Sequence, residues 1–244
     1  MKTTQSLTNK TAIITGGGSG IGQGIALAFA REGINVVICG RRAEALERTV
    51  QLAAGLAGQM IPIQGDVSVP EDVQHVVNGA LSQLGQVDIL VNNAAVGGGG
   101  RIHEHDIAVW DHTISVNLRG PFLMCRAVLP HMRAQKSGHI LNISSESGLN
   151  HYEGDGAYGV SKHALNALEE YIQRENQDLN IRVDTICPGM VVTEMTSDDP
   201  GLNHEKCLYP EDIADLAVWL VTRRRNVKIG TPILIQTMEN PWEQ

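Results

Sequence analysis

Short apolar segments alternate along the chain with longer segments whose apolar positions recur at helical spacing. Several of the short segments lack polar alternation, which is typical of strands covered on both faces of a parallel sheet. They span residues 11–15, 34–39, 60–63, 87–91, 139–143, 181–186 and 232–236. The longer segments, expected to be helices, span residues 21–31, 43–57, 70–84, 106–134, 157–178 and 211–222.

This alternation predicts the fold class. Strands joined by helices form right-handed crossovers, so we expect an α/β fold with a doubly wound parallel sheet and helices on both faces. No linker, low-complexity run or internal repeat divides the sequence, so residues 1–244 are predicted to form a single domain. Ligands of such sheets bind at the carboxyl ends of the strands, where functional residues should therefore lie.

Composition and charge narrow the function classes. The chain is 42% hydrophobic and has a formal net charge of −8, which argues against electrostatic binding to nucleic acid. No run approaches the roughly 20 apolar residues of a membrane span, and no signal peptide is evident. The four cysteines lack metal-ligand spacing. We expect a cytoplasmic protein with reduced thiols, no bound metal, no membrane contact and no nucleic-acid partner.

A glycine-rich turn follows the first predicted strand. It has the form Thr15-Gly16-x-x-x-Gly20-x-Gly22, and the pattern GxGxxG does not occur in it. The physical requirements are similar, because glycine lets the backbone approach a phosphate and the following helix N-terminus favours an anion. A merely flexible loop is the alternative. The position between a strand and an Ala-rich helix favours a dinucleotide site.

The second predicted strand ends at two arginines, Arg41 and Arg42, and no acid precedes Glu44. NAD sites usually have a ribose-binding carboxylate at this place, whereas arginine accommodates the 2′-phosphate of NADP. Arg41 is therefore the candidate for the 2′-phosphate. NADP(H) is favoured over NAD(H), which stays possible if Arg41 is only a solvated residue at a helix start.

Motifs along most of the chain, about residues 8–222, resemble those of the short-chain dehydrogenase/reductase family. They are TGGGSGIG at 15–22, GDV at 65–67, NNAA at 92–95, Asn117 in SVNLRG, SSESG at 144–148, YGVSK at 158–162 and CPGMVVT at 187–193. The resemblance implies a Rossmann-type domain with strand order 3-2-1-4-5-6-7, an NAD(P)-dependent carbonyl/alcohol oxidoreductase, and a homotetramer or homodimer. Ala95 stands where the family usually has glycine.

The same motifs imply the cofactor contacts. Asp66 and Val67 resemble the adenine contacts, and Val191 and Thr193 resemble the nicotinamide-side contacts. The complete set expected to bind the cofactor is Thr15, Gly16, Ser19, Gly20, Ile21, Gly22, Arg41, Arg42, Asp66, Val67, Asn93, Ala94, Tyr158, Lys162, Pro188, Gly189, Val191 and Thr193.

The resemblance further implies a catalytic set of Asn117, Ser145, Tyr158 and Lys162. Tyr158 and Lys162 are four residues apart, so both project from one helix face. An ammonium beside a phenol lowers the phenol pKa, which suits a general acid. Tyr158 would protonate the alkoxide produced by hydride transfer, or take the alcohol proton in reverse. Lys162 would also hold the nicotinamide ribose.

The other two catalytic candidates have arguments of their own. The pattern S-x-x-G selects Ser145 over Ser144 and Ser147, and its hydroxyl can donate to the substrate carbonyl. Pro121 lacks the N–H that would bond the Asn117 carbonyl in a regular helix. We therefore expect a kink there. The freed carbonyl is compatible with the water that the family's equivalent asparagine binds.

Substrate contacts are expected from three loops, with Glu146, His151 and Tyr152 as candidates. Glu146 either recognises a cationic or hydroxylated substrate or is a solvated loop acid. The short, polar third loop favours a small or polar substrate. The atypical C-terminal tail is expected at a subunit interface, at the substrate pocket, or exposed. These segments are residues 96–105, 146–156, 194–210 and, for the tail, 237–244.

These observations predict an NADP(H)-dependent oxidoreductase that transfers a hydride between nicotinamide and a small polar ketone or aldehyde, or the corresponding alcohol. Within the family, a 3-oxoacyl-carrier-protein-type reductase and an NAD-dependent alcohol or sugar dehydrogenase are the alternatives. From another class, the alternative is a catalytically silent NADP-binding regulatory protein. The presence of all four catalytic residues argues against a silent protein.

Overall fold

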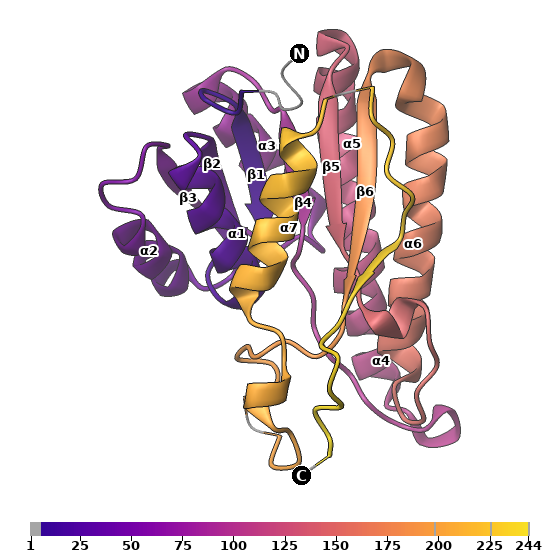
Figure 1. Ribbon diagram of the computed structural model, residues 1–244. Coiled ribbons are helices and arrows are strands. Elements are labelled where there is room, and N and C mark those ends of the chain that lie inside the picture. Colours follow the sequence, from indigo (N-terminus) through magenta and orange to yellow (C-terminus); the bar gives the residue numbers. More distant parts are fainter. Residues whose placement is uncertain (1–5, 198, 225, 244) are drawn as a thin grey trace.

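The computed structural model describes residues 6–197, 199–224 and 226–243. These residues form one sheet of seven parallel strands with helices on both faces (Figure 1), as the sequence predicts. The strand order is β3-β2-β1-β4-β5-β6-β7, which confirms the implied order. The strands are β1 (Thr11–Thr15), β2 (Asn35–Gly40), β3 (Met60–Gln64), β4 (Ile89–Asn92), β5 (Gly138–Ile143), β6 (Ile181–Pro188) and β7 (Ile233–Ile235).

Two layers of helices cover the sheet. Helices α1, α2 and α7 contribute to the core on one face, and α3, α5 and α6 to the core on the other. None of the described helices is both long and apolar enough to cross a membrane. The helices are α1 (Gly20–Arg31), α2 (Ala43–Leu52), α3 (Pro70–Leu84), α4 (Ile107–Ile114), α5 (Gly120–Gln135), α6 (Gly156–Asn176) and α7 (Pro210–Thr222).

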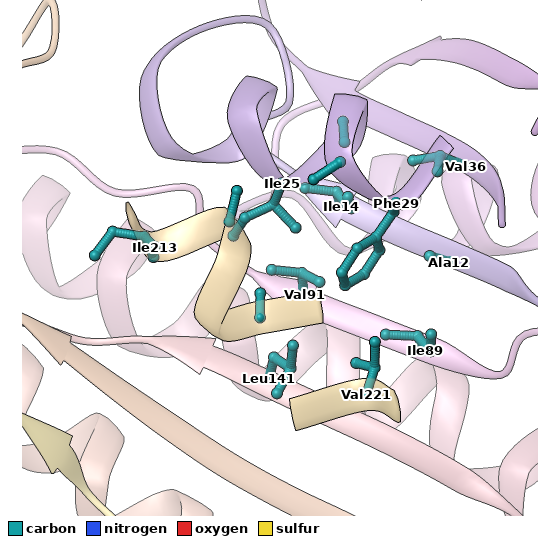
Figure 2. Packing of buried hydrophobic residues seen from close by; sticks show 14 of the residues in the cluster. Ala12, Ile14, Ile25, Phe29, Val36, Ile89, Val91, Leu141, Ile213 and Val221 are labelled. Carbon is teal, nitrogen blue, oxygen red and sulfur yellow. The ribbon is translucent and has the colours of Figure 1, made fainter. Parts of the chain in front are cut away.

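Strand β1 shows why apolar strands need two covered faces. Ile14 belongs to the same core as Phe29 of α1 and Ile213 of α7 (Figure 2). Its neighbour Ile13 belongs to the opposite core with Met124 of α5. Successive side chains of a strand point to opposite faces, so an uninterrupted apolar strand is stable only between two helical layers.

The helix expected at 106–134 is interrupted. It consists of α4, a π-helix at Ser115–Arg119, and α5. The Gly120 amide bonds the Ser115 carbonyl five residues earlier, the spacing of a π turn. The interruption includes Asn117. The sequence predicts a kink there, because Pro121 has no N–H to bond the Asn117 carbonyl. The π geometry itself is not evident from the sequence.

Helix α2 is shorter than the expected 43–57 because two glycines follow it. Gly55 has a φ of 81°, in the left-handed region. A Cβ on Gly58 would lie 1.9 Å from the carbonyl oxygen of Ile34, so only glycine fits this close approach. Both positions belong to the turn that leads into β3.

The C-terminal tail packs within the chain against segment 194–210. The Asn203 amide donates to the Pro241 carbonyl at 2.9 Å. Lys206 Nζ donates to the Glu243 carbonyl at 2.8 Å, and the Thr237 hydroxyl donates to the Lys206 carbonyl at 2.8 Å. Both segments lie beyond the carboxyl ends of the strands, at the bottom of Figure 1. Asp198 of this segment and Gln244 of the tail lie outside the described residues.

Candidate active site

A cavity of about 490 Å³ lies at the carboxyl ends of the central strands. It is bounded by the glycine turn after β1 and by the ends of β2, β3, β4 and β5. It also reaches the start of α6 and the segment after β6. Of the predicted cofactor residues it brings together Gly16, Ser19, Gly20, Ile21, Arg41, Arg42, Asp66, Val67, Asn93, Ala94, Tyr158, Lys162 and Thr193.

The glycine turn fits a dinucleotide phosphate. Gly16 and Gly20 have φ values of 68° and 53°, which L side chains rarely adopt. A Cβ on Gly16 would lie 2.7 Å from Asn93 Nδ2. Gly20 begins α1, and the side chain of Ser19 makes no capping hydrogen bond with that helix. The first amides of α1 are therefore suited to an anion.

Two predicted cofactor residues support the turn without lining the cavity. The Thr15 hydroxyl accepts from the amides of Asn93 and Ala94 at 3.0 and 3.1 Å. Gly22 leaves no room for a side chain, because a Cβ would lie 2.4 Å from both Asn93 Nδ2 and the Gly16 carbonyl oxygen. Both residues belong to the glycine turn, as the motifs predict, but they support the turn from outside the cavity.

Three more predicted contacts, after β6, lie outside the cavity. Pro188 ends β6 and is buried. The Gly189 amide bonds the Ile235 carbonyl at 2.8 Å. Val191 is 5% exposed and forms a bridge with Leu208. In this structure these residues pack β6 against β7 and segment 194–210, and Thr193 is the predicted residue of this region that lines the cavity.

The sequence analysis missed several lining residues. Glu194 and Met195 immediately follow Thr193, so adjacency to the motif was the available signal. The others are mostly small or apolar residues beside the motifs and carry little signal of their own. They are Gly18, Gly40, Ala45, Leu46, Gly65, Ala95, Val96, Gly97, Val116, Ile143 and Ser144.

An ion pair joins two sides of the cavity. Arg42, after β2, donates to Glu194 Oε2 at 2.6 Å and to the Ser19 hydroxyl at 3.2 Å. The hydrogen bond and charge of Arg42 hold the pKa of Glu194 below its usual value. Both side chains are more than half exposed, so the pair contributes little to stability. It does place a negative charge beside the arginines expected to meet a phosphate.

Asp66, after β3, is held as an acceptor at the end of the cavity beside Arg41. Partial burial raises its pKa, but hydrogen bonds from Ser68 and the charge of Arg41 outweigh this and lower the pKa. The Ser68 hydroxyl and amide donate to Asp66 Oδ1 at 2.7 and 2.8 Å. The side chain is therefore ionised near neutral pH and fixed in position, as recognition of an amino group requires.

The catalytic candidates from β5 and α6 meet at one end of the cavity. Tyr158 lies in the first turn of α6 and is hydrogen-bonded to Ser145, the residue after β5 that precedes Glu146. Lys162 Nζ lies 5.4 Å from the centroid of the Tyr158 ring and donates to the Ile143 carbonyl at 2.8 Å. The neighbouring Ser144 hydroxyl is directed to the Lys162 carbonyl at 3.3 Å.

The expectation that Lys162 lowers the phenol pKa is wrong in this structure. Burial raises the pKa of Tyr158 to about 12, with the Ser145 hydrogen bond opposing the shift. Burial also lowers the pKa of Lys162 to about 8. Desolvation of the buried phenol is the largest cause of the Tyr158 shift, and the charge of Asp155 adds to it. The i, i+4 spacing predicts proximity but not this desolvation.

Asn117 holds the π-helix to two neighbours. Its side-chain oxygen accepts from the Val96 amide at 2.8 Å, and its nitrogen donates to the Val96 carbonyl at 2.9 Å. The same nitrogen lies 3.1 Å from the Ser161 hydroxyl. Asn117 therefore joins the chain after β4 to the catalytic helix α6. Its 1% exposure is consistent with an internal position beside Lys162.

The three substrate candidates have different surroundings. Glu146 Oε2 accepts from the amide of Gln236, just after β7. Tyr152 is about half exposed and is hydrogen-bonded to Glu146. The His151 ring stacks on His163 of α6, with centroids 4.8 Å apart. The structure thus joins Glu146 and Tyr152 and turns His151 toward α6.

Comparison with known proteins agrees with this geometry. A sequence model described as short chain dehydrogenase matches residues 10–201. An uncharacterised oxidoreductase of Staphylococcus aureus is 32% identical over 224 residues, 92% of this chain and 96% of that protein. The crystal structure of a short-chain type dehydrogenase/reductase from Mycobacterium marinum superposes with a TM-score of 0.88 at 28% identity, covering 95% of each chain.

A further solved relative was determined with a cofactor analogue. It is an alcohol dehydrogenase from the archaeon Thermococcus sibiricus complexed with 5-hydroxy-NADP, with a TM-score of 0.87, 29% identity, and coverage of 95% of this chain and 98% of that one. The chain belongs to the short-chain dehydrogenase/reductase family. It is an NAD(P)-dependent oxidoreductase that acts on small molecules.

Proposed function

We propose that this enzyme is an NADP(H)-dependent carbonyl reductase or alcohol dehydrogenase for a small polar ketone or aldehyde, or the corresponding alcohol. The observation that carries the proposal is the single cavity that extends from Arg41 to Tyr158 and Lys162. Its two ends suit the two halves of the reaction, because one end has cations for phosphate and the other has proton donors for a carbonyl oxygen.

The bound nicotinamide supplies or accepts the hydride. In carbonyl reduction, Tyr158 donates its phenolic proton to the substrate oxygen as negative charge develops there, and in the reverse direction it removes the alcohol proton. Ser145 donates a hydrogen bond to the same oxygen and keeps it beside Tyr158. Lys162 holds the cofactor ribose beside Tyr158. Asn117 positions α6 and the proton path beside Lys162.

Preference for NADP(H) rests on Arg41 and Arg42 at the end of β2. Arginine binds phosphate through planar, charge-assisted hydrogen bonds, and a 2′-phosphate is the group that distinguishes NADP from NAD. The likeness to an alcohol dehydrogenase complexed with an NADP analogue supports this choice. An NAD-dependent alcohol or sugar dehydrogenase is the alternative, in which neither arginine contacts the cofactor.

We also propose that the enzyme assembles as a homotetramer or homodimer. Large apolar side chains are about half exposed on the outer surfaces of α5, α6 and α7, namely Phe122, Val160 and Trp219. Self-association would remove this surface from water. Sedimentation equilibrium of the purified chain determines the assembly.

The proposed function is tested by following the absorbance of NADPH and NADH with a panel of small ketones and aldehydes, and of NADP⁺ and NAD⁺ with the matching alcohols. We expect turnover with polar carbonyls and a higher kcat/KM with NADPH. Turnover confined to acyl-carrier thioesters would favour the 3-oxoacyl reductase. Tight NADPH binding without turnover of any carbonyl or alcohol would favour the alternative of a catalytically silent NADP-binding regulatory protein.

The Arg42–Glu194 pair gives a prediction for cofactor affinity. Glu194→Gln removes the carboxylate that neutralises Arg42, so the guanidinium becomes available to the cofactor. Exposed ion pairs are weak, so we expect the Kd for NADPH to fall by about two- to fivefold. Fluorescence titration measures the change. Glu205→Gln, an exposed acid of the same segment, is the control and should leave the Kd unchanged.

The effect of Glu194→Gln should be larger for NADPH than for NADH if Arg42 meets the 2′-phosphate. An equal gain for both cofactors would assign Arg42 to the pyrophosphate that they share. Unchanged or weaker binding of both would show that the ion pair does not compete with the cofactor.

A further inference from the structure

Glu146 occupies a position where an ionised side chain can affect the reaction directly. It follows Ser145 in the chain, and consecutive Cα atoms lie about 3.8 Å apart. Ser145 in turn is hydrogen-bonded to Tyr158. Glu146 is not among the residues that line the cavity, and its carboxylate lies beside Gly189 and Gln236, so it would meet a substrate group that extends from Tyr158 past Ser145.

The carboxylate of Glu146 is fixed by partners from distant parts of the chain. Gln236 Nε2 donates to Glu146 Oε2 at 2.5 Å. Tyr152 is also hydrogen-bonded to Glu146, and its pKa is raised by partial burial together with the charge and hydrogen bond of Glu146. These contacts orient Glu146, although its hydrogen bond with Gln236 lies at the exposed surface.

The arrangement depends on the atypical C-terminal segment. The Gly189 amide bonds the Ile235 carbonyl at 2.8 Å, which brings the end of β7 beside the end of β6. A Cβ on Gly189 would lie 3.2 Å from Gln236 Cγ and 3.5 Å from Glu146 Oε2. The missing side chain at Gly189 leaves the carboxylate in contact with the chain after β6. The three segments that follow β5, β6 and β7 therefore converge on one carboxylate.

The bonding around Glu146 leaves room for another donor. Within the described part of the chain, Glu146 takes part in none of the ion pairs, so neutral groups hold it. An ionised carboxylate has about four acceptor positions, and Gln236 and Tyr152 each occupy one. An acceptor that is oriented but not saturated is suited to discriminate substrates, because a ligand without a donor leaves its acceptor positions unpaired.

We propose that Glu146 is a specificity-determining residue that accepts a hydrogen bond from a substrate hydroxyl close to the reacting carbonyl. The substrate class is then the hydroxyketones or hydroxyaldehydes and the corresponding polyols. Gln236 and Tyr152 are positioning residues for Glu146. A substrate ammonium is the competing donor, and it is distinguished from a hydroxyl by the choice of substrates. This inference rests on the proposed carbonyl reductase activity.

The test compares substrates of equal size that differ by one hydroxyl. The pairs are hydroxyacetone with butan-2-one, and 4-hydroxybutan-2-one with pentan-2-one, each with saturating NADPH. We expect the wild type to prefer the hydroxyketone of at least one pair. In Glu146→Leu, which has no acceptor, the kcat/KM ratio within that pair should fall about tenfold or more, and in Glu146→Gln, which keeps one acceptor oxygen, it should fall less. The ratio cancels differences in cofactor binding between variants.

Two further variants separate positioning from general damage. Gln236→Ala should raise KM for the hydroxyketone more than it lowers kcat, because Glu146 loses its orientation while Tyr158 and Ser145 remain. Glu153→Gln is the matched control, since Glu153 is an exposed acid of the same loop that pairs with Arg101 at 2.6 Å. It should retain the wild-type ratio. Unchanged NADPH binding shows that each variant is folded.

The outcomes separate this inference from the proposed function. Reduction of both members of a pair with the same ratio in wild type and Glu146→Leu would overturn the role of Glu146 and leave the carbonyl reductase standing. If the wild type prefers aminoacetone over hydroxyacetone and Glu146→Gln loses this preference, the substrate group that Glu146 binds is an ammonium. This result would overturn the proposed substrate class. Absence of turnover with every carbonyl would remove the proposed function and this inference together.

Discussion

Replacing Tyr158 by phenylalanine should lower kcat by about two to four orders of magnitude while the Kd for NADPH stays within about twofold of wild type. The variant loses one oxygen atom, and with it the proton donor of the proposed mechanism. General acid–base catalysis typically contributes about 10²–10⁴-fold to a rate. The aromatic ring keeps its packing, so the cavity and Lys162 should remain in place. Steady-state kinetics and fluorescence titration measure the two quantities.

The control for this variant lies on the same helix. Tyr171 is also in α6 but is 67% exposed and remote from the cavity, so Tyr171→Phe should retain wild-type kcat. Near-normal turnover of Tyr158→Phe would refute the proton-donor role. The raised pKa of Tyr158, about 12 in the free enzyme, predicts that the phenol stays protonated across the neutral range. Carbonyl reduction therefore starts from the acid form that it requires.

Arg41→Asp should reverse the preference between the two cofactors. It removes a cation from the proposed 2′-phosphate site and adds a carboxylate, which would repel that phosphate and bind the ribose hydroxyls of NAD(H). Loss of one charge-assisted phosphate contact and the new repulsion should raise the Kd for NADPH by about 10- to 100-fold. Affinity for NADH should be unchanged or improved. Titration with both cofactors gives the ratio.

Arg126→Asp is the matched control for Arg41→Asp. It makes the same change in net charge on the exposed surface of α5, away from the cavity, and should leave both Kd values at wild type. If NADPH affinity is unchanged in Arg41→Asp, the assignment of Arg41 is wrong. Loss of NADPH affinity in Arg42→Asp alone would move the 2′-phosphate site to Arg42.

The fold was predictable from the sequence because its main determinant is the pattern of apolar positions within each short segment. Apolar strands without polar alternation, such as residues 11–15, require cover on both faces, and the intervening helical segments provide it. The π-helix around Asn117 was not predictable. The missing amide of Pro121 reveals that a regular helix must fail there, but several geometries satisfy that requirement. The end of α2 depends on the contact of Gly58 with Ile34, which no local pattern shows.

The candidate site was predictable where motifs place residues next to strand ends. The contacts that the sequence missed join residues far apart in the chain, such as Arg42 with Glu194 and Glu146 with Gln236. Neither member of such a pair has a distinctive local pattern. The error about the Tyr158 pKa has the same origin, because desolvation depends on how the surrounding chain packs.

The hydrogen bonds between the tail and segment 194–210 hold these two segments together. The segment begins at the residue that pairs with Arg42, on the side proposed for the cofactor, and the tail begins beside the residue that holds Glu146, on the side proposed for the substrate. The segment cannot swing away from the cavity without breaking its bonds to Thr237, Pro241 and Glu243 or drawing the tail with it. A displacement of segment 194–210 would therefore also disturb the chain that holds Glu146.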